Sequence, residues 1–535
     1  MKTKSILGMI VSAVLIITTI AACVPPAVQQ MDQSAASEAL AQRNGNDQDP
    51  VNGNNGSNGE RNSLIIATQN EAPSVAPARH SVAASSFKNV MTHNGLFRSD
   101  YATLAPVPDL VAEWRAVSDV LFEFRLYEGI LFHNGEEMTA YDVVASFYYV
   151  RNYPDARSSH LSAVAAEVVD RYTFTIYTGS PNASLFFDLT AHGNFVMPKS
   201  LIEGGHDFTV APIGSGPFVF EEWASGDYFR FSRFDGYFDT ERMAQIEYVT
   251  WRVIPEGASR TIALENGEVD LIIEVPEADV PRLEENPDIS VFMREGTAFH
   301  KLLLNHLRHP FDNIVVRQAL NMAIDQEALV MAAFEGLAVP LRAQVPTVFP
   351  GTNDDGVLPF DPEGARALLA EHNIDPATLG FDMIASSEER MRMAVVVQAQ
   401  LLDIGIPTTI TVNDHATTID RSLNEDYDAL FGMFNSSNLI SGVRTIYHGG
   451  LEGFQNRNRI NNPELNELID LAIATIDTDE RNAVFEDISR KVNGLAVNVP
   501  THLPITIRAF NSNLVVPEIG ADGSMNLNMV NWSSQ

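Results

Sequence analysis

Two short segments of the chain alternate apolar and polar side chains with a period of two. They are residues 121–127 (Leu-Phe-Glu-Phe-Arg-Leu-Tyr) and residues 172–177 (Tyr-Thr-Phe-Thr-Ile-Tyr). Successive side chains of a β-strand point to opposite faces of a sheet. The alternation therefore predicts two strands that each have one buried face.

A helix is predicted where apolar residues recur every three or four positions behind a capping residue. Thr139 and Asp142 have the spacing of a capping box, and they precede Val143, Phe147 and Val150 on one helix face. We therefore expect a helix to begin directly after Thr139.

Three more helices are predicted nearer the carboxyl end. Asp361 followed by Pro362 opens a segment that runs through residue 369. Asn462 followed by Pro463 opens a segment whose inward residues are Leu465, Leu468, Ile469, Ala472 and Ile476. Thr478 starts the third, with Val484, Ile488 and Val492 spaced for burial and Gly494 placed to end the helix. Because strands and helices are interleaved along the whole length, the predicted class is mixed α/β.

The first 23 residues have the pattern of an export signal. Lys2 and Lys4 precede an uncharged apolar run over 6–20, which is shorter than the roughly 20 residues of a spanning helix. The run ends in Ile20-Ala21-Ala22-Cys23, which resembles the lipobox of bacterial lipoproteins. This resemblance implies a lipid anchor, such as palmitate, on Cys23. The alternative is an ordinary signal peptide with an incidental cysteine.

Cys23 is the only cysteine of the chain, so the rest has no thiol for a disulfide, a metal site or a nucleophile. Residues 24–62 are rich in Gln, Asn, Gly, Ser and Asp and bury too little apolar surface to fold, so we expect a disordered tether. A net charge of −34 argues against nucleic acid as a partner. The remaining chain, about 470 residues, exceeds one hydrophobic core and implies at least two lobes.

Several blocks, in order, resemble the extracellular solute-binding protein family 5, the dipeptide- and oligopeptide-binding receptors of ABC importers. The blocks are Pro-Asp-Leu-Val-Ala-Glu-Trp (108–114), Phe-Glu-Phe-Arg-Leu (122–126), Gly-Ile-Leu-Phe-His-Asn-Gly-Glu (129–136), Thr-Ala-Tyr-Asp-Val (139–143), Pro-Ile-Gly-Ser-Gly-Pro-Phe (212–218) with Trp223, Leu-Glu-Asn-Gly-Glu-Val-Asp (264–270), Val-Arg-Gln-Ala-Leu-Asn-Met-Ala-Ile-Asp (316–325) and Leu-Asp-Ile-Gly-Ile (402–406). Together they span nearly all of the mature chain.

The resemblance implies a three-domain fold like that of periplasmic binding proteins (type II, cluster C), with a ligand cleft between two lobes. Transferred to this chain, domain I is 63–98, 211–297 and 505–535, domain II is 99–210, and domain III is 298–504. The implied function is that of an extracytoplasmic receptor, periplasmic or lipid-anchored to the outer face of the cytoplasmic membrane. It would bind a peptide or similar small solute and deliver it to permease and ATPase subunits. We expect a monomer without cofactor or metal.

Most residues of these blocks are interpreted as structural. Trp114 and Trp223 are expected to anchor hydrophobic cores, and Gly214 and Gly216 suit a turn. A phosphate-binding loop is not indicated, because no Lys-Ser or Lys-Thr follows a glycine.

The chain departs from the peptide-binding members where they supply a carboxylate for the ligand's ammonium group. In the matching run, residues 427–436, Met433 replaces a tryptophan and Ser436 replaces the aspartate. A buried ammonium without a counter-charge is costly. Glu71, Asp414 or a shifted loop could supply the charge, or the solute could be an oligosaccharide or a metal chelate. The residues predicted to face the ligand are Asn70, Glu71, Gly432, Met433, Phe434, Asn435 and Ser436.

Other classes of protein are less well supported by the residues. A secreted hydrolase would need a catalytic motif, and neither His-Glu-x-x-His nor Gly-x-Ser-x-Gly occurs. His300, His306 and His309 cluster near one another but fit no common zinc spacing, so they are interpreted as solvated loop residues. A sensory or adhesive surface protein that binds without transport stays open.

Overall fold

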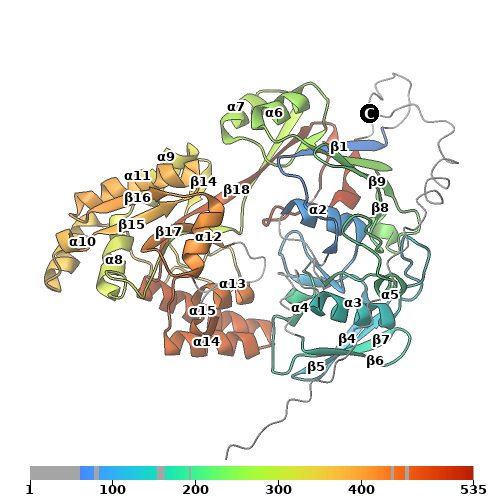
Figure 1. The fold of residues 1–535 in the computed structure, drawn as a ribbon, viewed down its shortest axis with the longest axis horizontal. Coiled ribbons are helices and arrows are strands. Elements are labelled where there is room, and N and C mark those ends of the chain that lie inside the picture. Colours follow the sequence, from blue (N-terminus) through green and yellow to red (C-terminus); the bar gives the residue numbers. More distant parts are fainter. Residues whose placement is uncertain are drawn as a thin grey trace, which may run out of the picture. The chain divides into compact units, whose positions relative to one another are not determined.

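The computed structural model describes residues 61–77, 83–152, 163–191, 194–434, 439–451, 457–517 and 519–533 (Figure 1). Cys23, the export signal and the predicted tether up to residue 60 lie outside these residues. Arg61 and Asn62 do not belong to a free tether, because Arg61 pairs with Asp270 at 2.6 Å and Asn62 donates to Glu247 at 2.7 Å. Within the described residues, no helix has the length and apolar character needed to cross a membrane.

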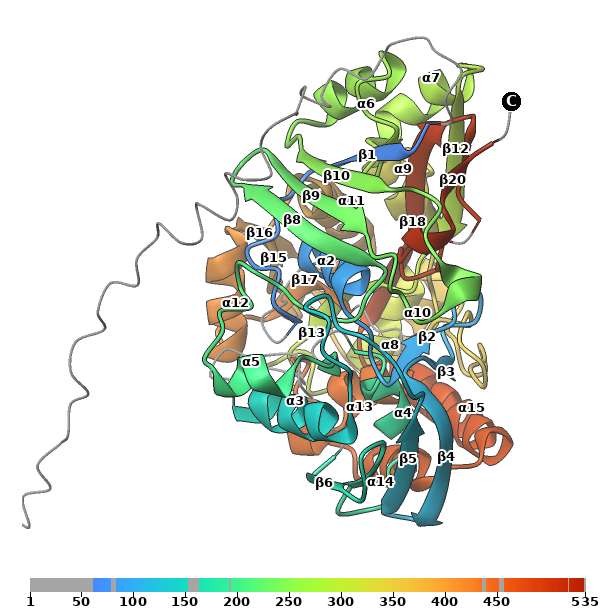
Figure 2. The same cartoon turned by 90° about the vertical axis from the view of Figure 1, so that its right-hand side faces the viewer.

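The first of three structural parts is built on strands from both ends of the chain. Its apolar core surrounds the fully buried Trp251, and Figure 2 shows β1, β10, β9 and β8 side by side. Its elements are β1 (Ser63–Thr68), α2 (Ala83–Thr92), β8 (Phe218–Ala224), β9 (Tyr228–Arg233), β10 (Tyr248–Val253), α6 (Gly257–Glu265), β11 (Leu271–Ile272), α7 (Val280–Glu284), β12 (Ile289–Glu295), β19 (Leu514–Val515) and β20 (Asn531–Trp532).

The second part is a separate four-stranded sheet in the order β4-β5-β7-β6, covered on one face by a core that includes Phe122, Phe124 and Phe174. Its elements are β2 (Phe97–Ser99), β3 (Pro106–Pro108), β4 (Val111–Ser118), β5 (Leu121–Leu126), α3 (Ala140–Asn152), β6 (Ala165–Val168), β7 (Thr173–Tyr177), α4 (Leu185–Asp188) and α5 (Lys199–Glu203). The two strands predicted from alternation are confirmed as β5 and β7.

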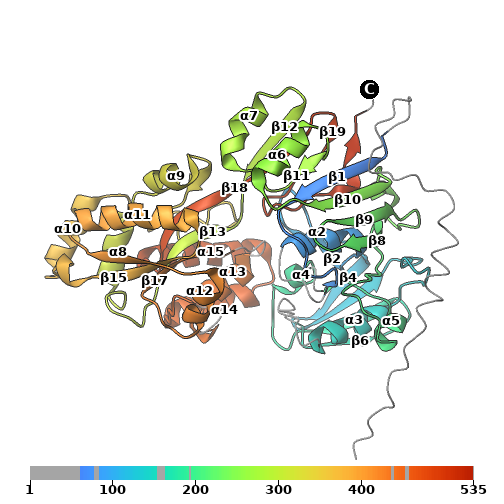
Figure 3. The ribbon, with the colours of Figure 1, turned by 45° about the horizontal axis from the view of Figure 1, so that its top comes forward.

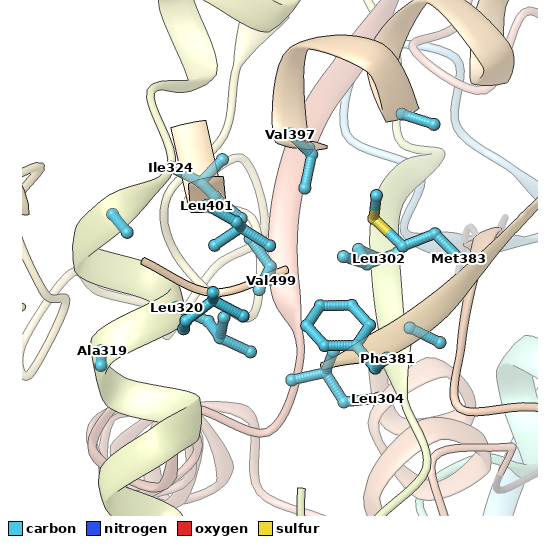
Figure 4. Close-up of a cluster of buried hydrophobic side chains, with 14 of the residues drawn as sticks. Leu302, Leu304, Ala319, Leu320, Ile324, Phe381, Met383, Val397, Leu401 and Val499 are labelled. Carbon is cyan, nitrogen blue, oxygen red and sulfur yellow. The ribbon is translucent and has the colours of Figure 1, made fainter. Parts of the chain in front are cut away.

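The third part combines a sheet with most of the helices, and Figure 4 shows its core side chains from β13, β15, α8, α11 and β18 pointing toward one another. Its elements are β13 (Phe299–Leu304), α8 (Ile314–Ala323), α9 (Gln326–Phe334), β14 (Ala338–Pro340), α10 (Pro362–Glu371), β15 (Phe381–Ala385), α11 (Glu388–Asp403), β16 (Thr408–Val412), α12 (His415–Leu423), β17 (Ala429–Phe434), α13 (Leu439–Tyr447), α14 (Pro463–Ala474) and α15 (Thr478–Leu495).

One long strand, β18 (Val499–Asn511), belongs to both the first and the third part. Its early residues pair with β13 and β14, and residues from Ile505 onward pair with β12 and β11. Figure 3 shows β18 running from the helix-rich part toward β11 and β12. The sheet order is therefore continuous as β16-β15-β17-β13-β18-β11-β1-β10-β9-β8. The domain boundaries given above remain a prediction.

The predicted helix starts are confirmed by their caps. Asp142 accepts from the Thr139 amide at 2.8 Å, although the Thr139 hydroxyl also donates to Asp142 instead of accepting from its amide. Asp361 accepts from Gly364 N at 2.8 Å, and Asn462 accepts from Leu465 N at 3.0 Å. The last helix begins at Thr478, with Asp477 as its cap.

Two predictions about helix ends are wrong. Ile476 is 39% exposed, because α14 ends at Ala474 before the side chain can turn inward. Gly494 does not end α15, which continues to Leu495 and closes on Ala496 in the left-handed region (φ 46°). Ala496 is fully buried there, so its position is set by packing and not by backbone freedom.

The glycines of the block at 212–218 allow a close backbone approach instead of a special turn conformation. A Cβ on Gly214 would lie 2.3 Å from Thr92 O, and one on Gly216 would lie 2.5 Å from Met91 O and His93 N. Gly216 N donates to Thr92 O at 3.0 Å, so the two segments are also hydrogen-bonded. The end of α2 and this loop can meet only because neither glycine carries a side chain.

We expect Gly216→Ala to lower the free energy of unfolding by about 2 kcal/mol or more, because the neighbouring atoms are backbone and move little. Gly494→Ala is the matched control. A Cβ there meets nothing within 4 Å inside α15, so it should stabilise by about 0.5–1 kcal/mol. Urea unfolding of both variants checks the prediction, and equal stability of Gly216→Ala and wild type would contradict it.

The two tryptophans of the resemblance blocks differ in their environment. Trp223 stacks on Phe229 with ring centroids 5.0 Å apart and is partly buried against the first core, which agrees with the prediction that it packs there. Trp114 is 45% exposed, so its prediction as a core anchor is wrong. The reason is that β4 is the edge strand of its sheet, where Trp114 lies against Phe186 at 4.5 Å between centroids.

Candidate ligand-binding site

In the third part, three parallel strands have their carboxyl ends on the same side, and this row of strand ends forms one edge of the sheet. β15 pairs in parallel with both β16 and β17, so residues that follow these strands gather at their carboxyl ends. β13 runs antiparallel to β17 and therefore begins at the same edge, with Phe299 opposite Phe434 and His300 opposite Met433. Ligands of open α/β sheets bind at the carboxyl ends of parallel strands. This edge is therefore the candidate site.

The end of β17 carries three of the residues predicted to face a ligand. Gly432 is buried, and a Cβ there would lie 2.7 Å from Leu303 Cδ1, whereas Met433 is 44% exposed. Phe434 lies against Phe299 at 6.2 Å between centroids. Asn435 and Ser436 lie outside the described residues, so their role stays a prediction. Of the three described residues, Met433 has the most exposed side chain, and its contact with a solute stays a prediction.

Two histidines stack beside Met433. The rings of His300 and His502 are 4.2 Å apart between centroids, and Phe334 lies 4.3 Å from His502. Burial, helped by the positive charge of Arg390, lowers the pKa of His300 to about 4. Burial, together with His300 and Arg390, lowers the pKa of His502 to about 2. Both rings are therefore neutral at neutral pH.

Arg390 follows β15 in the first turn of α11. Its Nη1 donates to Ser386 Oγ at 2.6 Å, while its Nε is buried and has no acceptor within the described part of the chain. Burial lowers the pKa of Arg390, opposed by Glu389, and the guanidinium stays charged. The pKa of Arg457 is lowered chiefly by burial, and the positive charge of Arg390 lowers it further.

The predicted residues after β1 belong to a different part of the sheet. Asn70 is exposed, and Glu71 accepts from Trp223 Nε1 at 2.8 Å and from Gly226 N at 2.9 Å. Burial acts to raise the pKa of Glu71, but these hydrogen bonds and the charge of Lys88 lower it overall. Since β13, β18 and β11 separate β17 from β1 in the strand order, the structure does not bring Glu71 and Met433 together in one sheet edge.

Asp414, the other carboxylate considered as a partner for an ammonium, caps α12. It accepts from Thr417 N at 2.9 Å and from Thr417 Oγ1 at 2.6 Å. Its hydrogen-bonding capacity is thus used largely within its own helix.

The histidine cluster at 300–309 is not a set of solvated loop residues, so that interpretation is wrong for two of the three. His300 lies in β13, and His306 Nε2 lies 2.8 Å from Val497 O. Burial lowers the pKa of His306 to about 3. Only His309 is open to solvent, with 67% of its side chain exposed. Among the described residues, no group of three His, Cys, Asp or Glu side chains could hold a metal ion.

Three residues that lie near these strand ends were not predicted from the sequence. Arg390 and His502 are far from Met433 along the chain, and no local pattern marks them. Lys301 is fully buried and lies opposite Gly432 in the pairing of β13 with β17; its Nζ donates to Gln344 O and contacts the Tyr447 hydroxyl. Burial lowers the pKa of Lys301 well below its usual value. The one local signal in the sequence was a lysine directly before three leucines in β13, because a charged residue is uncommon in a buried strand.

The parallel strand ends and the strand shared by two cores give an α/β fold like that of periplasmic binding proteins. The chain belongs to the bacterial extracellular solute-binding proteins, family 5, whose model matches residues 105–442.

A glutathione-binding protein of Salmonella typhimurium is 30% identical over 334 residues, which cover 60% of this chain and 64% of that relative. Among solved structures, HbpA2 from Haemophilus parasuis superposes with a TM-score of 0.79 at 21% identity, covering 88% of this chain and all of the other. The periplasmic binding protein DppA from Helicobacter pylori, in complex with the peptide STSA, gives a TM-score of 0.75 at 22% identity over 89% of this chain and 99% of the other. These structures share the fold of this chain.

Proposed function

We propose that this chain is the extracytoplasmic solute-binding receptor of an ABC-type importer. It binds peptides or similar small solutes and delivers them to a membrane permease. The family match over residues 105–442 carries this proposal. The names of the relative and of the second solved structure, which mention glutathione and a peptide, favour peptide-like solutes over the oligosaccharides and metal chelates considered above.

The connections between the first and third parts support binding by closure of two lobes. One connection is β18 near Leu503–Ile505, and the other is the short segment 296–298 between β12 and β13. They are hydrogen-bonded to each other through Gly296 N and Pro504 O at 2.8 Å. Because two adjacent strands carry both connections, small backbone rotations there would move one part against the other. We place the boundary between domains I and III at this point.

Native mass spectrometry of the purified protein tests the proposal, because closed receptors retain their solute. We expect a bound solute of small mass that is released unchanged on denaturation, and that stabilises the protein when it is added back. Turnover of that solute above a buffer control would instead support the hydrolase alternative. A protein that retains nothing and is stabilised by no peptide, oligosaccharide or chelate pool would contradict the receptor function.

The same proposal includes a lipid anchor on Cys23. We expect Cys23→Ser to move the protein from the membrane fraction to the soluble fraction or the medium, because the variant has no thiol to carry a lipid. One acyl chain alone binds a membrane only marginally, so a stable anchor needs more than one chain. Fractionation and mass analysis of the amino-terminal peptide check this. A variant that remains at the membrane would show that Cys23 is not the anchor.

A further inference from the structure

The second and third parts touch beside α4, a place that carries neither of the two chain connections described above. In the sequence, β8 to β12 of the first part lie between these two parts, so their contact does not follow from chain connectivity. Ala183 N, two residues before α4, donates to Ile473 O of α14 at 2.8 Å. Figure 3 shows α4 on the side of the second part that faces the helices of the third.

The residues around the start of α4 belong to two different cores. Leu185 is fully buried in the core of the second part, and Phe186 lies 5.7 Å from Phe122 of that part between ring centroids. Ala183 is 6% exposed and packs instead in the core of the third part that includes residues of α13, α14 and α15. Phe187 packs against the same core. One short segment is therefore anchored in the second part and inserted into the third.

The acceptor of the hydrogen bond lies at the carboxyl end of α14. The last four carbonyl groups of a helix have no partner within the helix. Ile473 O belongs to this set, and its partner, Ala183 N, comes from the second part. Part of the capping of α14 is therefore lost whenever the second and third parts separate.

The contact is small compared with the one between the first and second parts. Those two parts share the buried ion pair Asp109–Arg242 at 2.5 Å, so they form one lobe. In the described part of the chain, the other ion pairs of the second part lie within it, and none reaches the third part. An interface with one backbone hydrogen bond and two apolar side chains costs little to separate, which favours a contact that opens.

We propose that Ala183 and Phe187 form a latch, which closes the lobe of the first and second parts onto the third part without touching the solute. The inference rests on the proposed receptor function, in which the two lobes close around a solute. The latch stabilises the closed state for every solute alike. Because the apparent affinity scales with the population of the closed state, the latch contributes to affinity but not to specificity.

Ala183→Asp should open the latch, because it places a carboxylate in an apolar contact beside the negative end of the α14 dipole. Water solvates this carboxylate once the lobes separate, so the variant should fold. Small-angle X-ray scattering of the full chain without added solute should give a larger radius of gyration than for wild type. Solute that wild type retains in native mass spectrometry should dissociate at least about tenfold faster from the variant.

Ala116→Asp is the matched control, because Ala116 is exposed on β4 of the same part. It should scatter X-rays and retain solute like wild type, and circular dichroism should show every variant folded. Phe187→Ala, which shortens the latch without adding a charge, should shift both measurements in the same direction by less. It decides the question if Ala183→Asp does not fold.

The latch is overturned if Ala183→Asp, or Phe187→Ala in its place, has the radius of gyration and solute retention of wild type; the receptor function then stands. Unchanged scattering with unfolding at lower urea concentration would identify a fixed structural contact and would also overturn the latch. A wild type that retains no solute and is stabilised by no solute pool contradicts the receptor function. In that case a larger radius of gyration of the folded variant would still support the latch.

Discussion

Lowering the pH from about 7 to about 5 should destabilise the protein by several kcal/mol, even though it reduces the excess of negative charge. His93 and His133 illustrate the cause at the meeting of the first two parts. Burial, with His133 contributing, lowers the pKa of His93 to about 3, and burial lowers the pKa of His133 to about 4. Unfolded histidine has a pKa near 6.5. Between about pH 6.5 and 4 the unfolded chain therefore takes up protons that the folded chain does not.

The sign follows from proton linkage. The folded pKa values are depressed, so for these neutral histidines the stabilisation is complete above about pH 6.5 and is lost as the pH falls toward the folded pKa. At about pH 5 the loss approaches 2 kcal/mol for each fully buried histidine. Carboxylates titrate mainly below this window, so histidine dominates within it.

Urea unfolding at several pH values measures this slope. His93→Gln should flatten the slope relative to wild type, whatever its effect on absolute stability. His309→Gln, which changes an exposed side chain, should leave the slope unchanged. A stability that is constant or rises between about pH 7 and 5 would show that charge repulsion outweighs the buried rings.

Asp109→Ala should lower the free energy of unfolding by about 3 kcal/mol, because it leaves a partly buried guanidinium without its closest partner. Asp109 is almost fully buried, accepts from Arg242 Nη2 at 2.5 Å and accepts from Asn94 Nδ2 at 2.9 Å. Asn94 also receives a hydrogen bond from Ser215 at 3.2 Å. One carboxylate thus ties together segments of the first and second parts.

The exposed pair Arg115–Glu123 provides the control. Its distance is 2.7 Å, but the arginine side chain is largely exposed, so Glu123→Ala should cost less than about 1 kcal/mol. In the Asp109→Ala variant, Arg242 still has Asp239 as a partner at 2.6 Å. The expected loss of unfolding free energy is therefore at the lower end of the range for breaking a buried ion pair. Chemical unfolding of both variants compares them. Similar losses for the two would show that burial of Asp109 contributes little.

The parts of the fold that were predictable from the sequence depend on neighbouring residues. Asp361 and Asn462 mark helix starts because each side chain accepts from an amide three residues later, and Thr139 marks one because its amide donates to Asp142. The alternation in 121–127 marks β5 because it, too, depends only on residues next to one another in the chain. Where an outcome depended on distant packing, prediction failed: Trp114 is exposed because β4 is an edge strand, and Ala496 closes α15 because packing buries it.

The candidate site was predictable only in part. Met433 was found through a resemblance, and the structure places it at an exposed position on a parallel sheet edge. His502 and Arg390 reach that edge from β18 and α11, and nothing near them in the sequence relates them to Met433. The position of His502 opposite His300 follows from strand register, which a single sequence does not specify for residues so distant along the chain.

The strand order also determines when the protein can fold during its synthesis. β1 pairs with β11, which pairs with β18, and Trp532 donates from near the carboxyl terminus to Ser63 O at 3.0 Å. The Arg61 guanidinium lies over the same Trp532 ring at 4.1 Å. The surroundings of β1 are therefore complete only after Trp532 has been synthesised. Because such long-range pairing forms late, the first part stays incomplete while the strands and helices between β1 and Trp532 are made.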